Sequence, residues 1–200
     1  SELPLKGIRI IYEDDDILIA DKPFNMLSQK ATPTDISANE YLLGYLIRTG
    51  KLTREAFATF RPSVCNRLDR NTTGLILMGV SLKGSQELSA MLRERTIGKY
   101  YLAVVSGTLT KAERQKGYLV KDAKSNRVQI AATADQPDAK PIETAYRPLC
   151  SASGTTLLKV HLITGKTHQI RAHLVSIGHP IIGDPKYGDP IVNRKFSQDY

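Results

Sequence analysis

Apolar and polar residues alternate along many short stretches of the chain, with the two-residue period that is typical of β-strands. The alternation predicts strands at Ile8–Glu13, Ile17–Asp21, Gly74–Val80, Gly98–Gly107, Tyr118–Lys121, Arg127–Ala131, Glu143–Leu149 and Thr156–Ile163. Between the first two strands lie Asp14, Asp15 and Asp16. Consecutive side chains point in different directions, so this acidic run favours a turn over a metal site.

Apolar residues recur at three- and four-residue spacing in three other stretches, which predicts helices. One lies within residues 36–50, where Ser37 can cap the start and Gly50 can end it. The others are Leu82–Arg95 and Thr167–Ile177. About eight strands and three helices, joined mostly by hairpins, predict an α+β fold with a large, mixed but mainly antiparallel sheet and flanking helices. No repeat marks a boundary, so residues 1–200 are expected to form one domain.

Composition indicates the class of partner. The 200 residues include 28 Lys and Arg against 20 Asp and Glu, a net charge of +8, which favours a polyanion and nucleic acid first. No apolar run approaches the ~20 residues of a membrane span, so no membrane partner is expected. The cysteines, Cys65 and Cys150, are too far apart in sequence to form a metal or redox motif. A reducing, cytoplasmic location is therefore expected.

The stretch CNRLDRNTTGLILMG, residues 65–79, combines charge with a buried strand. Asp69 lies between Arg67 and Arg70, and a polar loop then leads into the apolar run that starts at Gly74. One interpretation is a structural ion pair in a turn. The other is a carboxylate that neighbouring cations keep ionised for nucleophilic or acid–base chemistry.

The stretch LITGKTHQIRAHL, residues 162–174, gathers basic and polar side chains at the start of a predicted helix. Gly165-Lys166-Thr167 is similar to the end of a phosphate-binding loop, but Val160 stands where that motif needs glycine, so no nucleotide cofactor is expected. His168 and His173 are five residues apart and have no cysteine nearby, which argues against zinc. A solvated helix face is the alternative to a functional cluster.

Three separated motifs resemble those of the RluA-type pseudouridine synthases. They are NRLDRNTTGLILMG, GKYYLAVVSG and GKTHQIRAHLVSIGHPIIGDPKYG, and their order is that of the family. The resemblance extends from about Ile8 to about Asp189. Asn66 stands where histidine is common in the family, and Lys166 where arginine is common. Both replacements keep a polar or basic group.

The resemblance implies a pseudouridine synthase catalytic fold with a central active-site cleft. It implies that Asp69 is the catalytic aspartate, that Tyr101 packs against the target base and that Arg171 pairs with Asp69. Arg67 is expected near the flipped nucleotide. Further contacts to RNA are expected from Arg70, Lys99, Lys166, His168 and Gln169.

The chemistry of such an enzyme can be stated from the reaction itself. The N1–C1′ bond of uridine breaks, the uracil turns, and C5 bonds to C1′, so atoms are conserved and no cofactor or metal is required. A carboxylate can attack the sugar, stabilise its growing positive charge or remove a sugar proton, and the sequence leaves these open. The uridine must also leave its stack, and a tyrosine face suits the extruded base.

The expected activity is therefore isomerisation of uridine in structured RNA, first of all ribosomal RNA of the large subunit, with transfer RNA as a second possibility. A non-catalytic RNA-binding module is the alternative, and Asp69 discriminates because a mere binder has no use for a carboxylate among arginines. We expect a monomer. The final stretch IVNRKFSQDY shows no obvious strand or helix. The gene product is expected to extend beyond Tyr200. In family members that are similar at the start of this chain, a small S4-like RNA-binding domain often precedes this point, and the sequence leaves open whether one does here.

Overall fold

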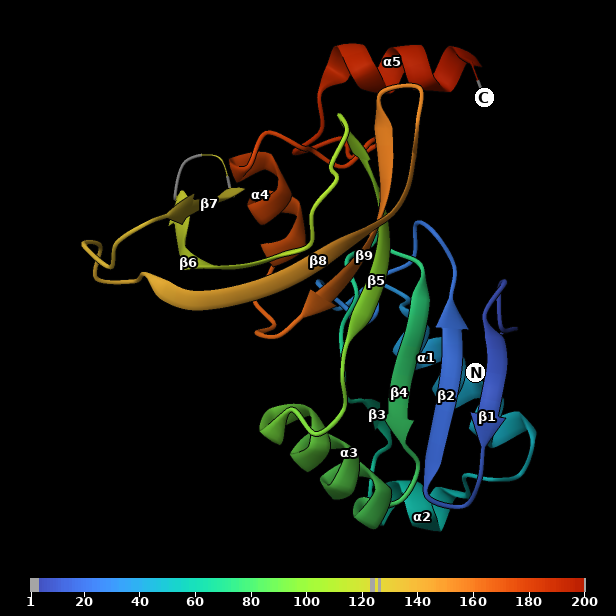
Figure 1. The fold of residues 1–200 in the computed structure, drawn as a ribbon. Helices are drawn as coiled ribbons and strands as arrows, with labels where there is room; N and C mark the ends of the chain where they lie inside the picture. The colour runs from blue at the N-terminus through green and yellow to red at the C-terminus, as the bar shows by residue number, and fades with distance from the viewer. Residues whose placement is uncertain (1–3, 123–124, 126, 200) are drawn as a thin grey trace. The chain divides into compact units, whose positions relative to one another are not determined.

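The computed structural model describes residues 4–122, 125 and 127–199, and the chain divides into two compact units, Ser1–Ile97 and Gly98–Tyr200. Each unit contains a sheet with helices beside it (Figure 1). The sheets have four and five strands, and every pairing of the named strands is antiparallel. The predicted α+β fold is confirmed, with the described strands divided between two sheets.

The first sheet has the strand order β1-β2-β4-β3. Its members are β1 (Arg9–Glu13), β2 (Ile17–Lys22), β3 (Ser63–Val64) and β4 (Gly74–Gly79). The turn between β1 and β2 is the predicted acidic run. Asp14 Oδ1 accepts hydrogen bonds from the backbone N–H groups of Asp16 at 2.9 Å and Ile17 at 2.8 Å, which confirms the turn.

Among the described residues of the first unit, the helices are α1 (Ala38–Arg48), α2 (Arg54–Thr59) and α3 (Leu82–Glu94). Ser37 is the N-cap of α1, as predicted, and its backbone N–H donates to the Glu40 carboxylate at 3.0 Å. Helix α2 was not predicted because it buries none of its six residues and so has no apolar stripe. Strand β3 was missed because two residues are too short to show alternation.

The second sheet has the order β5-β9-β8-β6-β7. Its members are β5 (Tyr100–Ser106), β6 (Glu113–Asp122), β7 (Arg127–Ala131), β8 (Lys140–Ala152) and β9 (Thr155–Leu162). Strands β6 and β8 are longer than predicted. Their added ends are rich in exposed residues, so hydrogen bonding continues there after the apolar pattern has ended.

The two faces of this sheet differ. One face, the inner face, packs against α4 (Gln169–Ser176) around the buried residues Ala103, Val105, Tyr146, Leu158, Val160 and Leu174. The opposite face, the outer face, leaves Tyr100, Leu102 and Val104 of β5 exposed. The predicted alternation along β5 is therefore confirmed, and the strand separates residues of the core from residues in contact with solvent.

The final stretch forms helix α5 (Pro190–Asp199), contrary to the sequence analysis. Asp189 Oδ1 accepts the backbone N–H groups of Ile191 at 2.8 Å and Val192 at 3.2 Å, and Pro190 occupies a first-turn position that suits proline. The start of this helix was readable from Asp189-Pro190, whereas its exposed face hid the periodicity. In the described part of the chain, no helix has the length and apolarity to cross a membrane.

Helix α3 packs in close contact with the β1–β2 turn at Gly84. A Cβ atom there would overlap the backbone carbonyl of Asp16. Gly84→Ala should lower the free energy of unfolding by about 2 kcal/mol, because the overlap outweighs the ~1 kcal/mol by which alanine favours a helix. Chemical denaturation measures the change. Ser89→Ala, at an exposed position of the same helix, is the control, and equal stability of both variants would contradict the packing argument.

Candidate active site

Asp69 lies in the loop between β3 and β4, half-buried, with Arg67 and Arg70 exposed on either side. The backbone N–H of Thr72 donates to the carbonyl of Asp69 at 3.0 Å, which closes a tight turn. The loop thus presents one carboxylate between two cations on a short, hydrogen-bonded segment.

Ser28 holds the residue before Asp69. Its hydroxyl accepts the backbone N–H of Leu68 at 2.9 Å and donates to the carbonyl of the same residue at 2.9 Å. Both Ser28 and Leu68 are buried. One side chain therefore satisfies both backbone groups of Leu68 and fixes the approach of the chain to Asp69.

Lys22 holds the residue after Asp69. Its ammonium donates to the carbonyls of Met26 at 2.7 Å, Pro23 at 3.1 Å and Arg70 at 3.2 Å. The side chain is fully buried, and burial lowers its pKa to about 8, against an opposing effect of the Asp69 charge. Lys22 is thus a buried cation within electrostatic reach of Asp69. Sequence reasoning missed it, although a lysine that ends an apolar strand just before proline is a usable signal.

Asn66, where the family commonly has histidine, docks the loop onto β4. Its Oδ1 accepts the backbone N–H of Leu77 at 2.7 Å, and its Nδ2 donates to the carbonyl of Leu75 at 3.1 Å. The amide has one donor and one acceptor in the places that a neighbouring strand would supply. This departure from the family pattern is therefore built into the local structure.

The second unit carries Lys99, Tyr101 and the helix α4 cluster. Tyr101 lies on the inner face, opposite Val160 in the β5–β9 pairing, and packs half-buried against the apolar core of that face. The Lys99 ammonium lies beside Gly165, where a Cβ atom would come within 2.7 Å of it. Lys99 thus lies next to the turn that contains Lys166.

The start of α4 is unusual because His168, its N-cap, has a left-handed backbone with φ of 56°. Gln169 follows, buried, and its amide nitrogen donates to the Glu143 carbonyl and the Thr144 hydroxyl, both at 3.0 Å. Its Oε1 accepts the Lys166 N–H at 3.1 Å. Gln169 therefore positions the Lys166 turn in the structure, and its predicted contact to RNA stays a prediction.

Arg171 forms a two-point ion pair with Asp184, which the sequence analysis did not identify. Arg171 Nε donates to Oδ2 at 2.7 Å and Nη2 to Oδ1 at 2.9 Å. The carboxylate is 5% exposed. Burial alone would raise the pKa of Asp184, but Arg171 and the backbone N–H groups of Tyr187 and Lys186 hold it below its usual value. The predicted pairing of Arg171 with Asp69 stays a prediction.

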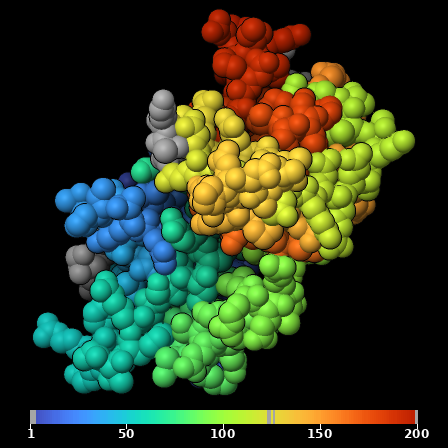
Figure 2. Space-filling model, turned by 90° about the vertical axis from the view of Figure 1, so that its left-hand side faces the viewer, coloured from blue at the N-terminus to red at the C-terminus, as the bar shows by residue number. Residues whose placement is uncertain are grey.

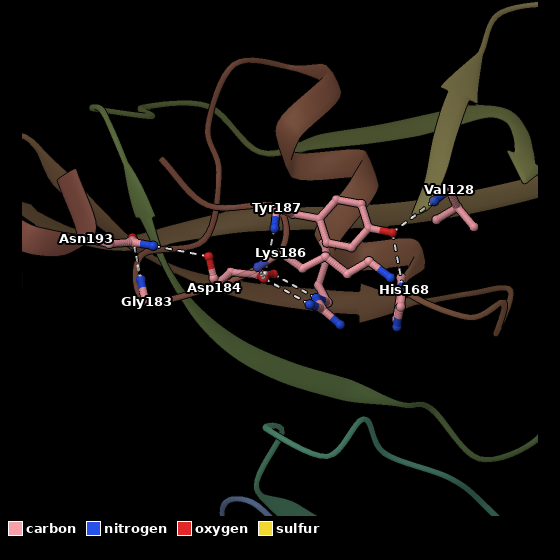
Figure 3. A network of polar contacts seen from close by, with 8 residues as sticks. Val128, His168, Gly183, Asp184, Lys186, Tyr187 and Asn193 are labelled. Carbon is pink, nitrogen blue, oxygen red and sulfur yellow. Dashed lines mark hydrogen bonds and ion pairs between the residues drawn. The ribbon is translucent and has the colours of Figure 1, made fainter. Parts of the chain in front are cut away.

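Tyr187 connects this ion pair to His168 (Figure 3). The Arg171 guanidinium lies 4.9 Å from the centre of the Tyr187 ring, and the His168 Nδ1 is 3.0 Å from the Tyr187 hydroxyl. The same hydroxyl accepts the backbone N–H of Val128 at 2.9 Å. Of the predicted site residues of this unit, the structure thus brings His168 and Arg171 together through Tyr187. Asp184 and Tyr187 both lie in GDPKYG, within the third motif.

The sequence of the chain matches known proteins across most of its length. Residues 16–176 match the family described as RNA pseudouridylate synthase. The chain is 37% identical over 188 residues to ribosomal large subunit pseudouridine synthase D of Nitrosomonas europaea, covering 93% of this chain and 50% of that protein. It is 33% identical over 186 residues to ribosomal large subunit pseudouridine synthase C of Vibrio cholerae, covering 90% and 53%. The chain thus spans about half the length of these relatives.

The fold agrees with that of a solved human protein, RNA Pseudouridylate Synthase Domain Containing 1. The TM-score is 0.71 at 21% identity, and the match covers 98% of this chain and 75% of that one. The fold is therefore that of pseudouridine synthases. The chain belongs to the RNA pseudouridylate synthase family, and its curated relatives support the RluA-type resemblance of its motifs.

Replacing Lys22 tests its hold on the Asp69 loop. Lys22→Met keeps the bulk of the side chain but leaves three carbonyls without their buried donor. The expected loss in free energy of unfolding is about 2–4 kcal/mol, because each unsatisfied buried group costs ~1–3 kcal/mol and relief from burying a charge offsets part of it. Denaturation at pH 7 measures it, with Lys195→Met on the exposed side of α5 as the control. Equal stability of both variants would contradict the role.

The same pair of proteins should differ in pH dependence. The pKa of Lys22 is about 8 in the folded protein, below its ordinary value of 10.5. Between these values the unfolded chain binds more protons, so this group makes stability rise with pH. The advantage of the wild type over Lys22→Met should therefore grow from pH 8 to pH 10. An advantage that stays constant or shrinks in that window would contradict the assignment.

Replacing Asp184 tests the support of Arg171. Asp184→Asn leaves the guanidinium without its buried counter-charge and should cost about 3 kcal/mol of stability, as does breaking other buried pairs. Asp189→Asn removes the same charge from an exposed cap and should change stability little. Denaturation curves of both proteins provide the comparison. If both substitutions lower the free energy of unfolding by the same amount, the Arg171–Asp184 pair stabilises the protein no more than an exposed helix cap does.

Proposed function

We propose that this chain carries the catalytic activity of a pseudouridine synthase that converts uridine to pseudouridine in ribosomal RNA of the large subunit. The observation that carries the proposal is the Asp69 loop. Its carboxylate is half-buried between two exposed arginines, and its flanking residues are held by Ser28 and Lys22. Membership of the family and the names of its relatives support the same reaction.

In the proposed reaction the Asp69 carboxylate acts at C1′ of the flipped nucleotide. The N1–C1′ bond breaks as positive charge grows on the sugar, and the carboxylate either stabilises this charge or forms a bond to C1′. The freed uracil turns and C5 bonds to C1′, and where the carboxylate has bonded to C1′ that bond breaks and releases Asp69. The proton on C5 then leaves to water, and N1, which carries no proton in uridine, gains one from water, so the net change is an isomerisation.

The remaining predicted residues bind and orient the RNA. Tyr101 is rigidly placed by its strand and its core contacts, which suits a platform for the extruded base. Arg171, fixed by Asp184, is proposed to supply positive charge for the carboxylate. Contacts to phosphates are assigned to the basic side chains Arg67, Arg70, Lys99 and Lys166.

The proposal also includes the RNA substrate, the oligomeric state and the location of the enzyme. The substrate is ribosomal RNA in preference to transfer RNA, in line with the names of the relatives. The chain acts as a monomer in the cytoplasm and without a nucleotide cofactor. The isomerisation conserves the atoms of the nucleotide, so it needs no co-reactant.

Substitution of Asp69 tests the reaction. Asp69→Asn should lower turnover by at least about 1,000-fold and leave RNA affinity within a few-fold, because phosphate contacts dominate binding. Release of tritium from RNA that carries 5-tritiated uridine measures turnover, since the C5 hydrogen leaves in every version of the mechanism. Filter binding of the same RNA measures affinity.

Asp15→Asn is the matched control, since this carboxylate is exposed in the β1–β2 turn. It should release tritium at the wild-type rate. Turnover of purified Asp69→Asn within ten-fold of the wild type would refute the assignment of Asp69. Absence of tritium release by the wild type on every ribosomal RNA fragment tested would refute the proposed substrate.

A further inference from the structure

The outer face of the second sheet carries a groove on the side opposite to Tyr101. Its volume is about 440 Å³, and its lining comes from β5, β6, β8 and β9. All lining residues belong to the second unit: Tyr100, Ala112, Glu113, Arg114, Ala145, Tyr146, Arg147, Lys159 and His161. The register places Glu113 and Tyr146 with the inner-face residues, so these two line only the border of the groove.

The register of the sheet explains why this face is hollow. Tyr100 pairs with His161, His161 with Ala145, and Ala145 with Arg114, so these four residues form one row across four strands. Ala145 is the small member of the row, between an aromatic pair and a long basic side chain. The neighbouring row contains Leu102, Lys159 and Arg147. The concavity thus follows from one small side chain among large ones.

The aromatic side of the groove is already stacked. The rings of Tyr100 and His161 lie 4.6 Å apart at an interplanar angle of 20°, and the Lys159 ammonium is 4.6 Å from the centre of the Tyr100 ring. Tyr100 is nevertheless 56% exposed. Its ring bends back over Gly98, where a Cβ atom would come within 2.6 Å of it. A fixed aromatic pair whose tyrosine is exposed, beside a lysine, is suited to stacking with a nucleobase.

The other side of the groove is basic. Arg147 is exposed, and the Arg114 side chain is 64% exposed while it pairs with Glu143. Glu113 is the acid among the lining residues, and its carboxylate accepts hydrogen bonds from Tyr146 at 3.2 Å and Gln115 at 2.9 Å. Lys159 and Arg147 are thus the cations of the lining that can pair with phosphates, which an apolar occupant would not do.

We propose that this outer groove binds a second, single-stranded segment of the RNA substrate, with a base against the Tyr100–His161 pair and phosphates beside Lys159 and Arg147. The inference rests on the proposed function, in that the occupant is part of the same RNA. Because Tyr100 and Tyr101 point to opposite faces of β5, adjacent residues would serve two separate contacts. The groove would increase the affinity for the RNA and help to select which uridine is modified, without taking part in the reaction.

Two kinds of variant test the groove. Ala145→Leu fills its floor without a change of charge, and Tyr100→Ser removes the stacking ring, with Tyr100→Phe as the conservative control. Ala145→Leu and Tyr100→Ser should each weaken binding of a ribosomal RNA fragment at least about fivefold, a loss typical of one stacked base. Tyr100→Phe should bind as the wild type does. Tritium release at saturating RNA should be unchanged in all three.

Charge reversal tests the phosphate contacts. The double variant Lys159→Glu/Arg147→Glu should lower the slope of log affinity against log salt by about 1.5, since each lost contact removes ~0.7–0.9. Two reversals on α5, Lys195→Glu and Arg194→Glu together, give the same net charge at exposed positions away from the lining. Ultraviolet cross-linking to a labelled oligoadenylate, which contains no uridine, should mark Tyr100 itself in the wild type, as located by fragmentation of the peptide, and the mark should be absent from Tyr100→Ser.

The outcomes separate this inference from the proposed function. If the wild type releases tritium but the groove variants bind RNA as well as their controls do, the groove inference is wrong and the proposed function stands. If the wild type releases no tritium, the proposed function fails, while cross-linking at Tyr100 still reports on RNA in the groove. A wild-type dimer that Ala145→Leu dissociates in sedimentation would show that a second copy occupies the groove and would overturn the inference.

Discussion

The buried ammonium of Lys22 is the constraint on which the geometry of the Asp69 loop depends. A charged amine in a protein interior is costly unless each of its donors has an acceptor. Here the acceptors include backbone carbonyls of two different segments. One is Met26, shortly after β2, and the other is Arg70, in the loop that carries Asp69. The lysine therefore couples the end of β2 to a loop nearly fifty positions further along the chain. Because of this coupling, the position of Asp69 is fixed relative to the strands of the first sheet.

The second unit uses the same principle with the opposite charge. Asp184 is buried, accepts two hydrogen bonds from Arg171 and two more from backbone N–H groups, and so holds a guanidinium in one orientation. In each unit a concealed ion supports a more exposed group that the family motifs single out. Concealed ions are a poor source of net stability. Their value here lies in orientation, which reactions that depend on placed charges require.

The sequence was sufficient to predict the α+β class, most strands, the long helices and the family, because each leaves a periodic or motif signal. It was insufficient for α2 and β3, which are too short for periodicity, and for α5, whose exposed residues obscure the helical spacing. Lys22, Ser28 and Asp184 escaped for a different reason. Their partners are backbone atoms or residues distant in sequence, so the folded chain is needed to show which groups they bind.

The amide of Asn66 makes the attachment of the Asp69 loop to β4 less sensitive to acid than a histidine would. A histidine that bridged the same two backbone groups of β4 would need one protonated and one unprotonated ring nitrogen, and it would lose its acceptor on gaining a proton near neutral pH. The amide of Asn66 does not titrate, so its bonds to Leu75 and Leu77 persist as the solution is acidified. The connection that carries Asp69 onto β4 is thereby independent of proton concentration in the range where a histidine would act as a switch.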